Sequence, residues 1–167
     1  MEYIKATDEN TDIIFDIVQN TVRAIYPKYY PKEVVDFFCE HHSRENIAKD
    51  IEHGSAGILV VDSQIIGTGC QEDNHITRVY VLPEFQGKGC GSFIMQCLED
   101  EIAAKHNTVL LDASLPASHL YEQRGYHTIK HEKLPVENDV VLVYEVMEKV
   151  LPERKERMRK EFFEYEK

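Results

Sequence analysis

Hydrophobic residues recur with a helical period in the first third of the chain. Between residues 8 and 25 they follow a 3.6-residue rhythm, carried by Ile13, Ile14, Ile17, Val18, Val22 and Ile25. Pro27 is expected to end this helix, and Pro31 to open a second helical segment. Ser43 as an N-cap and Gly54 as a stop predict a third, shorter helix.

Shorter β-rich runs dominate the rest of the chain. Strands are expected at residues 3–6, 57–61, 64–71, 75–82, 108–111 and 140–147, with one more beginning at Tyr126. Helices are expected at residues 93–105 and 116–123. The order places β-hairpins first and a β-α-β-α-β run later. It predicts an α/β fold with a mixed sheet that helices flank.

The composition is that of an ordinary globular protein, with 43% hydrophobic and 29% charged residues in 167. It favours one domain, assigned to residues 1–150, followed by a densely charged tail over residues 151–167. Apolar residues recur at helical spacing in that tail, which indicates a helix that either docks on its own domain or contacts a second copy in a homodimer. No apolar run is long enough to span a membrane, and a cytoplasmic location is expected.

The net charge and the spacing of the cysteines limit the kinds of ligand that the protein is expected to bind. A net charge of −11 argues against nucleic acid and is compatible with a cationic acceptor such as an amine. Cys39, Cys70, Cys90 and Cys97 form no C-x-x-C pair and have no histidine at zinc spacing. Reduced thiols are therefore expected, and no metal site.

The segment from Val79 to Ser92 carries the clearest chemical signal. A hydrophobic strand runs into a turn with glycines at positions 87, 89 and 91, and the turn opens directly onto a helix. Such an arrangement gathers backbone N–H groups at a helix N-terminus, where the dipole favours an anion. Glycines suit it because a Cβ would keep a pyrophosphate away from the main chain. The segment predicts a phosphate-binding loop.

Two other phosphate motifs fit this loop poorly. A P-loop needs Ser or Thr directly after its lysine, and Lys88 is followed by Gly89. The dinucleotide fingerprint needs glycine at position 92, which is Ser92. Asp112 lies near the distance of that fingerprint's acidic residue but begins a different loop.

The loop instead resembles the acetyl-CoA loop of the GNAT acetyltransferase family, written Q/R-x-x-G-x-G/A. The match covers residues 86–91, Gln-Gly-Lys-Gly-Cys-Gly, with Pro83 ahead of it. Residues 113–126 resemble the family's later helix, in which an aliphatic–Tyr pair, here Leu120-Tyr121, precedes a Gly–aromatic dipeptide, here Gly125-Tyr126. The spacing between the two segments suits one helix and one strand.

This resemblance implies a mostly antiparallel, twisted central sheet of about six or seven strands, with helices on both faces. It implies acetyl-CoA as the cosubstrate. The pyrophosphate would be gripped by the backbone of Gln86, Gly87, Lys88, Gly89, Cys90, Gly91 and Ser92. The pantetheine arm would lie along the strand like an extra strand, bonded to main-chain groups of Val79 and Val81.

The resemblance also places catalytic groups. Tyr121 stands at the family's catalytic tyrosine, and a phenol with a pKa of about 10 is protonated at neutral pH and can donate to a departing thiolate. His75 falls where some members carry a base, and simple strand alternation would put it on one face with Thr77, Val79 and Val81. Lesser candidates for the base are Glu72, Asp112 and His119, whereas His41, His42 and His53 are expected at exposed helix ends.

One position departs from the family. Ser114 stands where many relatives have an asparagine that contacts the pantetheine arm. Its hydroxyl can still contact the cofactor or cap the following helix.

The resulting hypothesis is an acetyl-CoA-dependent N-acetyltransferase that acts on a primary amine by direct transfer in a ternary complex, with a small-molecule acceptor favoured. The alternatives are a protein or peptide N-acetyltransferase and a non-catalytic, CoA-binding regulatory protein.

Overall fold

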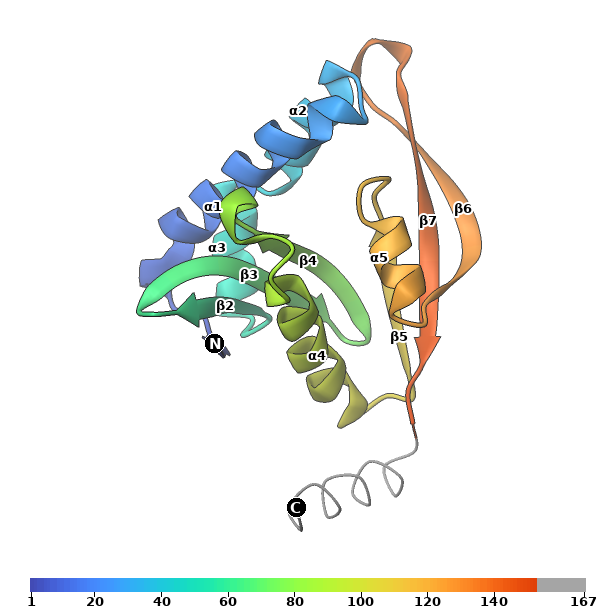
Figure 1. Ribbon diagram of the computed structural model, residues 1–167. Helices are drawn as coiled ribbons and strands as arrows, with labels where there is room; N and C mark the ends of the chain where they lie inside the picture. Colours follow the sequence, from blue (N-terminus) through green and yellow to red (C-terminus); the bar gives the residue numbers. More distant parts are fainter. Residues whose placement is uncertain (153–167) are drawn as a thin grey trace.

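The computed structural model describes residues 1–152 and contains one seven-stranded sheet in the order β1-β2-β3-β4-β5-β7-β6 (Figure 1). The strands are β1 (Glu2–Lys5), β2 (Ala56–Val61), β3 (Gln64–Glu72), β4 (His75–Val81), β5 (Thr108–Ala113), β6 (His127–Pro135) and β7 (Val141–Val150). Neighbouring strands are antiparallel except β4 and β5, which are parallel. The expected fold class is confirmed.

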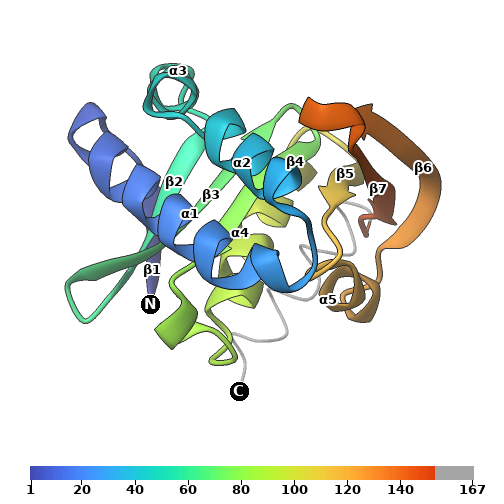
Figure 2. The same cartoon turned by 90° about the horizontal axis from the view of Figure 1, so that it is seen from above.

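Helices cover both faces of the sheet (Figure 2). The helices are α1 (Thr11–Ile25), α2 (Lys32–His41), α3 (Arg44–Glu52), α4 (Cys90–Ala103) and α5 (Ser118–Gln123). Short 3-10 helices lie at Asp8–Asn10, Tyr26–Lys28, Pro83–Phe85 and Glu137–Asp139. Ser43 caps α3 as expected, because its Oγ accepts a hydrogen bond from the Asn46 amide.

Each face of the sheet has its own hydrophobic core. One core packs α4 against β3, β4, β5 and β7 through side chains such as Ile94, Leu98 and Met147, which are almost completely buried. The other packs α1, α2 and α3 against β2, β3 and β4 through Ile14, Ile47 and their neighbours. The two cores hold the strand β4 between them, so the residues of this strand serve both sides of the molecule.

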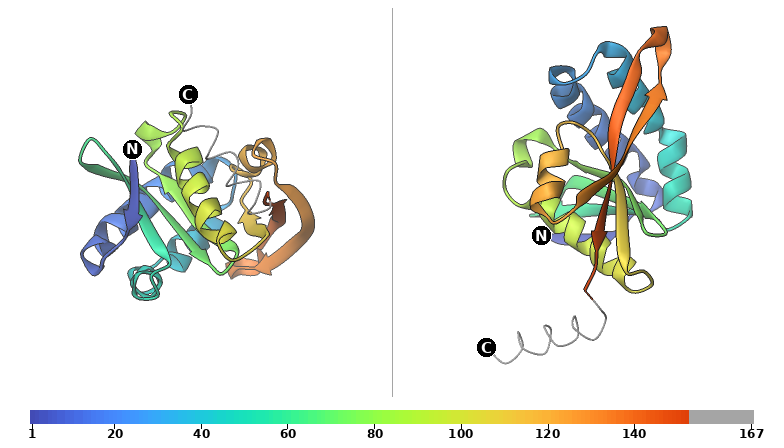
Figure 3. Two further views of the ribbon diagram at one scale, coloured as in Figure 1. Left: turned by 90° about the horizontal axis from the view of Figure 1, so that it is seen from below. Right: turned by 90° about the vertical axis from the view of Figure 1, so that its right-hand side faces the viewer.

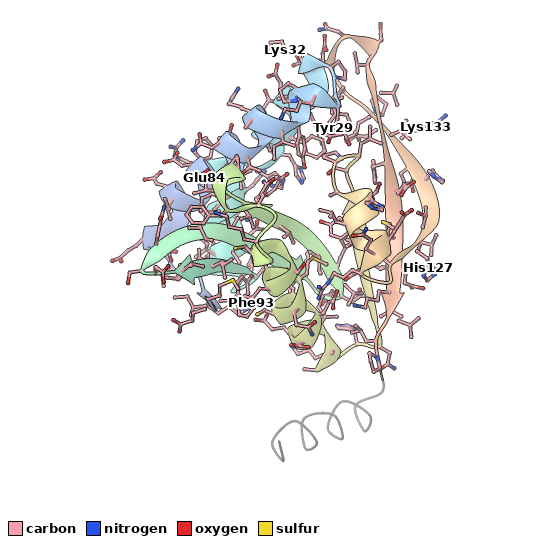
Figure 4. The ribbon with its side chains drawn as sticks, in the orientation of Figure 1. Tyr29, Lys32, Glu84, Phe93, His127 and Lys133 are labelled. Carbon is pink, nitrogen blue, oxygen red and sulfur yellow. The ribbon has the colours of Figure 1, made fainter. Side chains whose placement is uncertain are left out.

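The sheet divides between β4 and β5. These strands pair at His75↔Leu110 and Ile76↔Leu111, near the start of β4, and diverge beyond that point. Figure 1 shows the two halves as the arms of a V, with α5 beside β5 and the β6–β7 hairpin forming the outer arm. The hairpin rises above the rest of the sheet in the right-hand view of Figure 3. Figure 4 adds the side chains and labels His127 and Lys133 on its outer strand, β6. At its tip, Asn138 Nδ2 donates a hydrogen bond of 3.1 Å to Glu33 Oε1 of α2.

The element boundaries differ from expectation at two functional places. The helix after the glycine loop begins at Cys90 and not at residue 93, and the helix that carries Tyr121 begins at Ser118. The expected C-terminal helix and dimer contact fall on residues 153–167, outside the described part of the chain.

Candidate active site

The glycine loop joins β4 to α4 and leaves main-chain donors exposed. Gly87 and Gly89 have φ of +72° and +83°, a backbone region that side chains disfavour, and Gly89 is the N-cap of α4. No atom lies within 4 Å of the place where a Cβ would stand on Gly87, Gly89 or Gly91. The first turn of α4 contains no acidic residue and no side-chain cap. The N–H groups at the start of α4 therefore have no side-chain cap, and no side chain on the glycines keeps an anion away from them.

A cavity of about 650 Å³ lies above this loop, and we call it the loop pocket. It is lined by the predicted cofactor residues Val79, Val81, Gln86, Gly87, Gly89, Gly91, Ser92 and Ser114, together with Tyr121. The loop, the divergent end of β4 and the start of α5 thus come together around one space. These features fit a pyrophosphate followed by an extended arm.

Lys88 and Cys90 are predicted loop residues that do not line this pocket. Lys88 Nζ donates to the carbonyl of Glu84 at 2.9 Å and lies over the ring of Phe85. Cys90 is 5% exposed and packs into the α4 core. Their side chains therefore stabilise the loop and the helix, and what they can offer an anion is their backbone.

The main chain of β4 is directed into the V where the strands diverge. The carbonyl of Val81 accepts hydrogen bonds from Gln86 Nε2 at 2.8 Å and from Thr21 Oγ1 at 3.2 Å. It therefore points away from β3, and by strand alternation so do the N–H and C=O of Val79. Because the Val81 carbonyl is already satisfied, its N–H is the group left to meet an arm in the V.

A second cavity, of about 600 Å³, lies on the side of α2, and we call it the α2 pocket. Its walls come from α2, most of β4, the end of β5 and the β6–β7 hairpin, with the aromatic rings of Phe37, Phe38 and Tyr144 among them. Glu72, Asp73 and Asp112 supply carboxylates. Among the described lining residues, the one Lys or Arg is Arg78, which is 4% exposed and ion-paired with Asp50 at 2.5 Å. Negative charge therefore predominates.

The two pockets meet at a shared wall. Residues that line both are Tyr26, Val79, Tyr80, Ser114, Ala117 and Tyr121. Tyrosine side chains from the segment after α1 reach across the V to the segment after β5, since Tyr26 Oη donates to Ser114 Oγ at 3.3 Å and Tyr30 Oη accepts from the Leu115 amide at 2.6 Å. A group held in one pocket can thus reach a group held in the other at this wall.

Tyr121 is one of the residues of that wall. Its ring packs edge-on against Tyr126 at 5.9 Å and against the α4 core. Burial raises the pKa of Tyr121, and nearby Tyr26 acts in the same direction. The phenol is consequently protonated at neutral pH and beyond.

His75 lies on the α2 pocket, at the point where β4 and β5 pair. Its Nε2 atom is 3.5 Å from Asp112 Oδ2, which also lines this pocket. The expectation that His75 shares a face with Val79 and Val81 is wrong. The register between β3 and β4 shifts so that Thr77 is an extra residue, and Ile76 joins Val81 in the α4 core instead. The bulge turns His75 towards the α2 side.

His42 was expected at an exposed helix end, but it is buried, with 4% of its surface exposed. Its Nδ1 accepts a hydrogen bond from Arg78 Nε at 3.4 Å, and its ring meets Tyr80 edge-on at 5.3 Å. Burial lowers the pKa of His42 well below its usual value, and the Arg78 charge adds to this. His41 and His53 are exposed as expected, and so is His119 on α5.

A buried carboxylate lies behind the loop pocket. Glu99 of α4 accepts hydrogen bonds from Arg124 Nε and from Tyr126 Oη at 2.9 Å, and from Lys149 Nζ at 2.9 Å. Burial alone raises the pKa of this carboxyl, but the hydrogen bonds from Arg124 and Lys149 outweigh it, so the pKa is lowered. The cluster ties α4 to the end of α5 and to β7, and so holds the helix of Tyr121 in place.

The described residues contain no cluster of His, Cys, Asp and Glu side chains suited to a metal ion. Cys39, Cys70, Cys90 and Cys97 are free thiols. Within residues 1–152, no helix has the length and apolar character that crossing a membrane requires.

Comparison with known proteins places this geometry in a family. Residues 25–149 match the family described as "Acetyltransferase (GNAT) domain". No curated protein matches the sequence. Among solved structures, a GCN5-related N-acetyltransferase from Rhodopseudomonas palustris is similar with a TM-score of 0.82 and 19% identity, over 90% of this chain and 95% of that one.

Two further structures have the same fold. The PaiA N-acetyltransferase of Thermoplasma acidophilum, solved with coenzyme A, has a TM-score of 0.68 and 18% identity, over 89% of this chain and 98% of that one. The ribosomal-protein-alanine N-acetyltransferase of Brucella melitensis has a TM-score of 0.65 and 17% identity, over 90% of this chain and all of the other, 100%.

Proposed function

Because the chain belongs to the GNAT acetyltransferase family, we propose that it acetylates the primary amine of a small molecule by direct transfer in a ternary complex. The protein is an acetyl-CoA-dependent N-acetyltransferase. The observation that carries the proposal is the shared wall: the loop pocket and the α2 pocket are separate cavities that meet at Tyr121. Two substrates can therefore be held at the same time, with their reacting groups at one place.

Acetyl-CoA supplies the activated acetyl group as a thioester. The residues suited to hold it are the free N–H groups of the glycine loop and of the first turn of α4, for the pyrophosphate. The N–H and C=O of Val79 and the N–H of Val81 would bond the arm. Ser114, on the opposite side of the V, adds a hydroxyl. Lys88 and Cys90 contribute through the backbone alone.

Tyr121 is proposed as the proton donor to the departing thiolate. It lies on both pockets, and no described residue accepts a hydrogen bond from its hydroxyl. Burial raises the pKa of this phenol, which makes it a weaker acid than a phenol in water. The same desolvation raises the basicity of a thiolate formed beside it, so the proton transfer is not opposed.

His75 is proposed as the base that takes a proton from the amine. Its imidazole faces the α2 pocket, and the Asp112 carboxylate, 3.5 Å from Nε2, is placed to orient the ring. The two residues come from β4 and β5 at their point of pairing, which fixes their separation. Glu72 lies on the same pocket and adds negative charge there.

The α2 pocket supports a small cationic acceptor. Its volume of about 600 Å³ is within the range of small-molecule sites. Carboxylates of Glu72, Asp73 and Asp112 attract an ammonium group, and the aromatic walls suit its methylene chain. The hydrogen bond from Asn138 to Glu33 joins the hairpin tip to α2, so the two walls of this pocket are connected at that end.

A panel assay tests the function. Release of free CoA thiol is measured with polyamines, aminoglycosides, amino acids and N-terminal peptides, each at several concentrations. We expect turnover with a small amine. Turnover confined to peptides would overturn the choice of acceptor, and tight CoA binding without turnover on any amine would overturn the proposed transfer.

A further inference from the structure

Tyr26 is a tyrosine for which the proposed chemistry has no role so far, although it lies on the wall between the two pockets. It stands where α1 ends, next to Pro27, and is 7% exposed. Phe38 packs edge-on against its ring at 4.8 Å, and Tyr80 lies at 6.4 Å. Its ring is therefore held on both sides, and its hydroxyl is aimed across the V.

The hydroxyl of Tyr26 connects two other hydroxyls. It donates to Ser114 Oγ at 3.3 Å, and its oxygen lies 3.3 Å from Tyr80 Oη. A phenol has a single hydrogen to donate. Since Tyr26 gives that hydrogen to Ser114, Tyr80 must be the donor in the other pair. The hydrogen bonds thus run in one direction, from Tyr80 to Tyr26 and from Tyr26 to Ser114.

The direction determines what Ser114 can do. A serine hydroxyl has one hydrogen and two lone pairs, and here a lone pair is taken by Tyr26. Among the described residues, none accepts a hydrogen bond from Ser114 Oγ. Ser114 lines the loop pocket and the α2 pocket. Its hydrogen is consequently available to a ligand.

This row of hydrogen bonds also keeps its direction as the pH changes. Burial raises the pKa of Tyr26 and raises that of Tyr80 well above its usual value. Both phenols are therefore neutral in the range where the enzyme works. Neither phenol therefore becomes a phenolate, which could only accept and would reverse the direction of the hydrogen bonds.

We propose that Tyr26 is a positioning residue, which holds the Ser114 hydroxyl as a hydrogen-bond donor to a carbonyl oxygen of the pantetheine arm. This inference rests on the proposed contact between Ser114 and the cofactor. A serine side chain alone can rotate between donor and acceptor roles. The bond from Tyr26 occupies one lone pair and orients the hydroxyl so that its free hydrogen can meet the carbonyl, whereas an asparagine amide has a donor group of its own.

A double-mutant cycle tests the coupling, with the affinity for CoA itself as the readout. The dissociation constant is measured by calorimetry for the wild type, Tyr26→Phe, Ser114→Ala and the double variant. We expect each single change to weaken binding about fivefold, the worth of one hydrogen bond, and the double variant to be no weaker than Ser114→Ala. Thermal unfolding confirms that each variant is folded.

A rescue variant and a matched control sharpen the test. Ser114→Asn carries its own donor, so adding Tyr26→Phe to it should leave CoA affinity unchanged. Tyr30→Phe removes a neighbouring tyrosine hydroxyl that bridges the V to the Leu115 amide without touching Ser114. Its effect should be the same with Ser114 and with Ser114→Ala.

The outcomes separate this proposal from the one on which it rests. Unchanged affinity in Ser114→Ala would remove Ser114 from the cofactor site and with it the role of Tyr26. Weakened binding in Ser114→Ala, with a further full loss on adding Tyr26→Phe, would overturn the coupling and leave the Ser114 contact intact. If Tyr26→Phe lowers the CoA affinity of the Ser114→Asn variant, the positioning role of Tyr26 is overturned as well.

Discussion

The imidazole of His75 lies 3.5 Å from the Asp112 carboxylate, at the place where β4 and β5 pair before they diverge. A base at this position is held by the sheet itself, since each partner belongs to a strand and not to a loop. The α2 pocket opens directly above the pair.

Replacing His75 by glutamine should lower kcat by about 10²-fold, the usual contribution of general-base catalysis. The loss should shrink as the pH rises, because more of the acceptor amine is then neutral without help. Steady-state rates between pH 6.5 and 9.5 measure this. His53→Gln, on an exposed histidine, serves as the control. An equal loss at every pH would contradict the assignment.

Replacing Tyr121 by phenylalanine should lower kcat by about 10²-fold while the dissociation constant for CoA changes less than about twofold. Because burial raises the pKa of this phenol, the wild-type rate should show no alkaline decline caused by Tyr121 up to pH 10. Turnover, calorimetry and a pH profile check the three statements. Unchanged turnover in the phenylalanine variant would reject Tyr121 as the acid.

Substitutions of Gly91 can distinguish effects on CoA binding from effects on stability. The φ of Gly91 is not positive, and no neighbouring atom lies within 4 Å of the place where a Cβ would stand. Gly91→Glu should keep or improve the stability of α4, since a carboxylate in the first turn favours the helix dipole. It should nevertheless weaken CoA binding by more than about 100-fold, because the carboxylate occupies the anion site. Gly91→Ala is the uncharged control. Calorimetry and thermal unfolding should therefore move in different directions in Gly91→Glu.

Glu99→Gln tests the buried cluster behind the loop pocket. The change removes the charge that Arg124 and Lys149 share, and leaves both cations largely buried and unpaired. We expect a loss of about 3 kcal/mol in the free energy of unfolding, measured with urea. Lys5→Ala, which breaks a much more exposed ion pair with Glu101, should cost far less. Equal effects of the two changes would contradict a stabilising role for the cluster.

His42 predicts how stability depends on pH. Because burial lowers its pKa in the folded protein, the unfolded chain binds a proton below about pH 6.5 that the folded protein does not. The free energy of unfolding should fall from pH 6.5 to 5.5, and His42→Gln, which keeps an acceptor for Arg78, should reduce this fall by about 1 kcal/mol. Urea unfolding at both values measures it. His53→Gln should have no such effect.

Local signals in the sequence predict much of this fold. The 3.6-residue rhythm marks α1, and the Ser43 cap marks the start of α3. The turn at Asp62 and Ser63, both with positive φ, separates β2 from β3 as expected. The glycine loop is found at a helix N-terminus, beside a pocket that also contains Tyr121. These features depend on neighbouring residues, and a pattern read along the chain can therefore detect them.

The missed parts depend on contacts between distant residues. No periodicity reveals that Thr77 forms a bulge, which decides the pocket that His75 faces. His42 looks like an exposed helix end until Arg78 and Tyr80 pack against it. Tyr26 reads as the residue before a helix-ending proline, yet its hydroxyl meets Ser114, 88 residues away. The sequence signal for this role is the group of tyrosines Tyr26, Tyr29 and Tyr30 beside Pro27 and Pro31.

The divergence of β4 and β5 leaves backbone groups of Val79 and Val81 facing the V with no neighbouring strand to bond. In the proposed complex, the amides of the cosubstrate arm would complete the sheet that the polypeptide leaves unfinished. The two halves of the sheet nevertheless stay joined, because the α4 core includes side chains from β4, β5 and β7, and the cosubstrate can therefore leave without opening the fold.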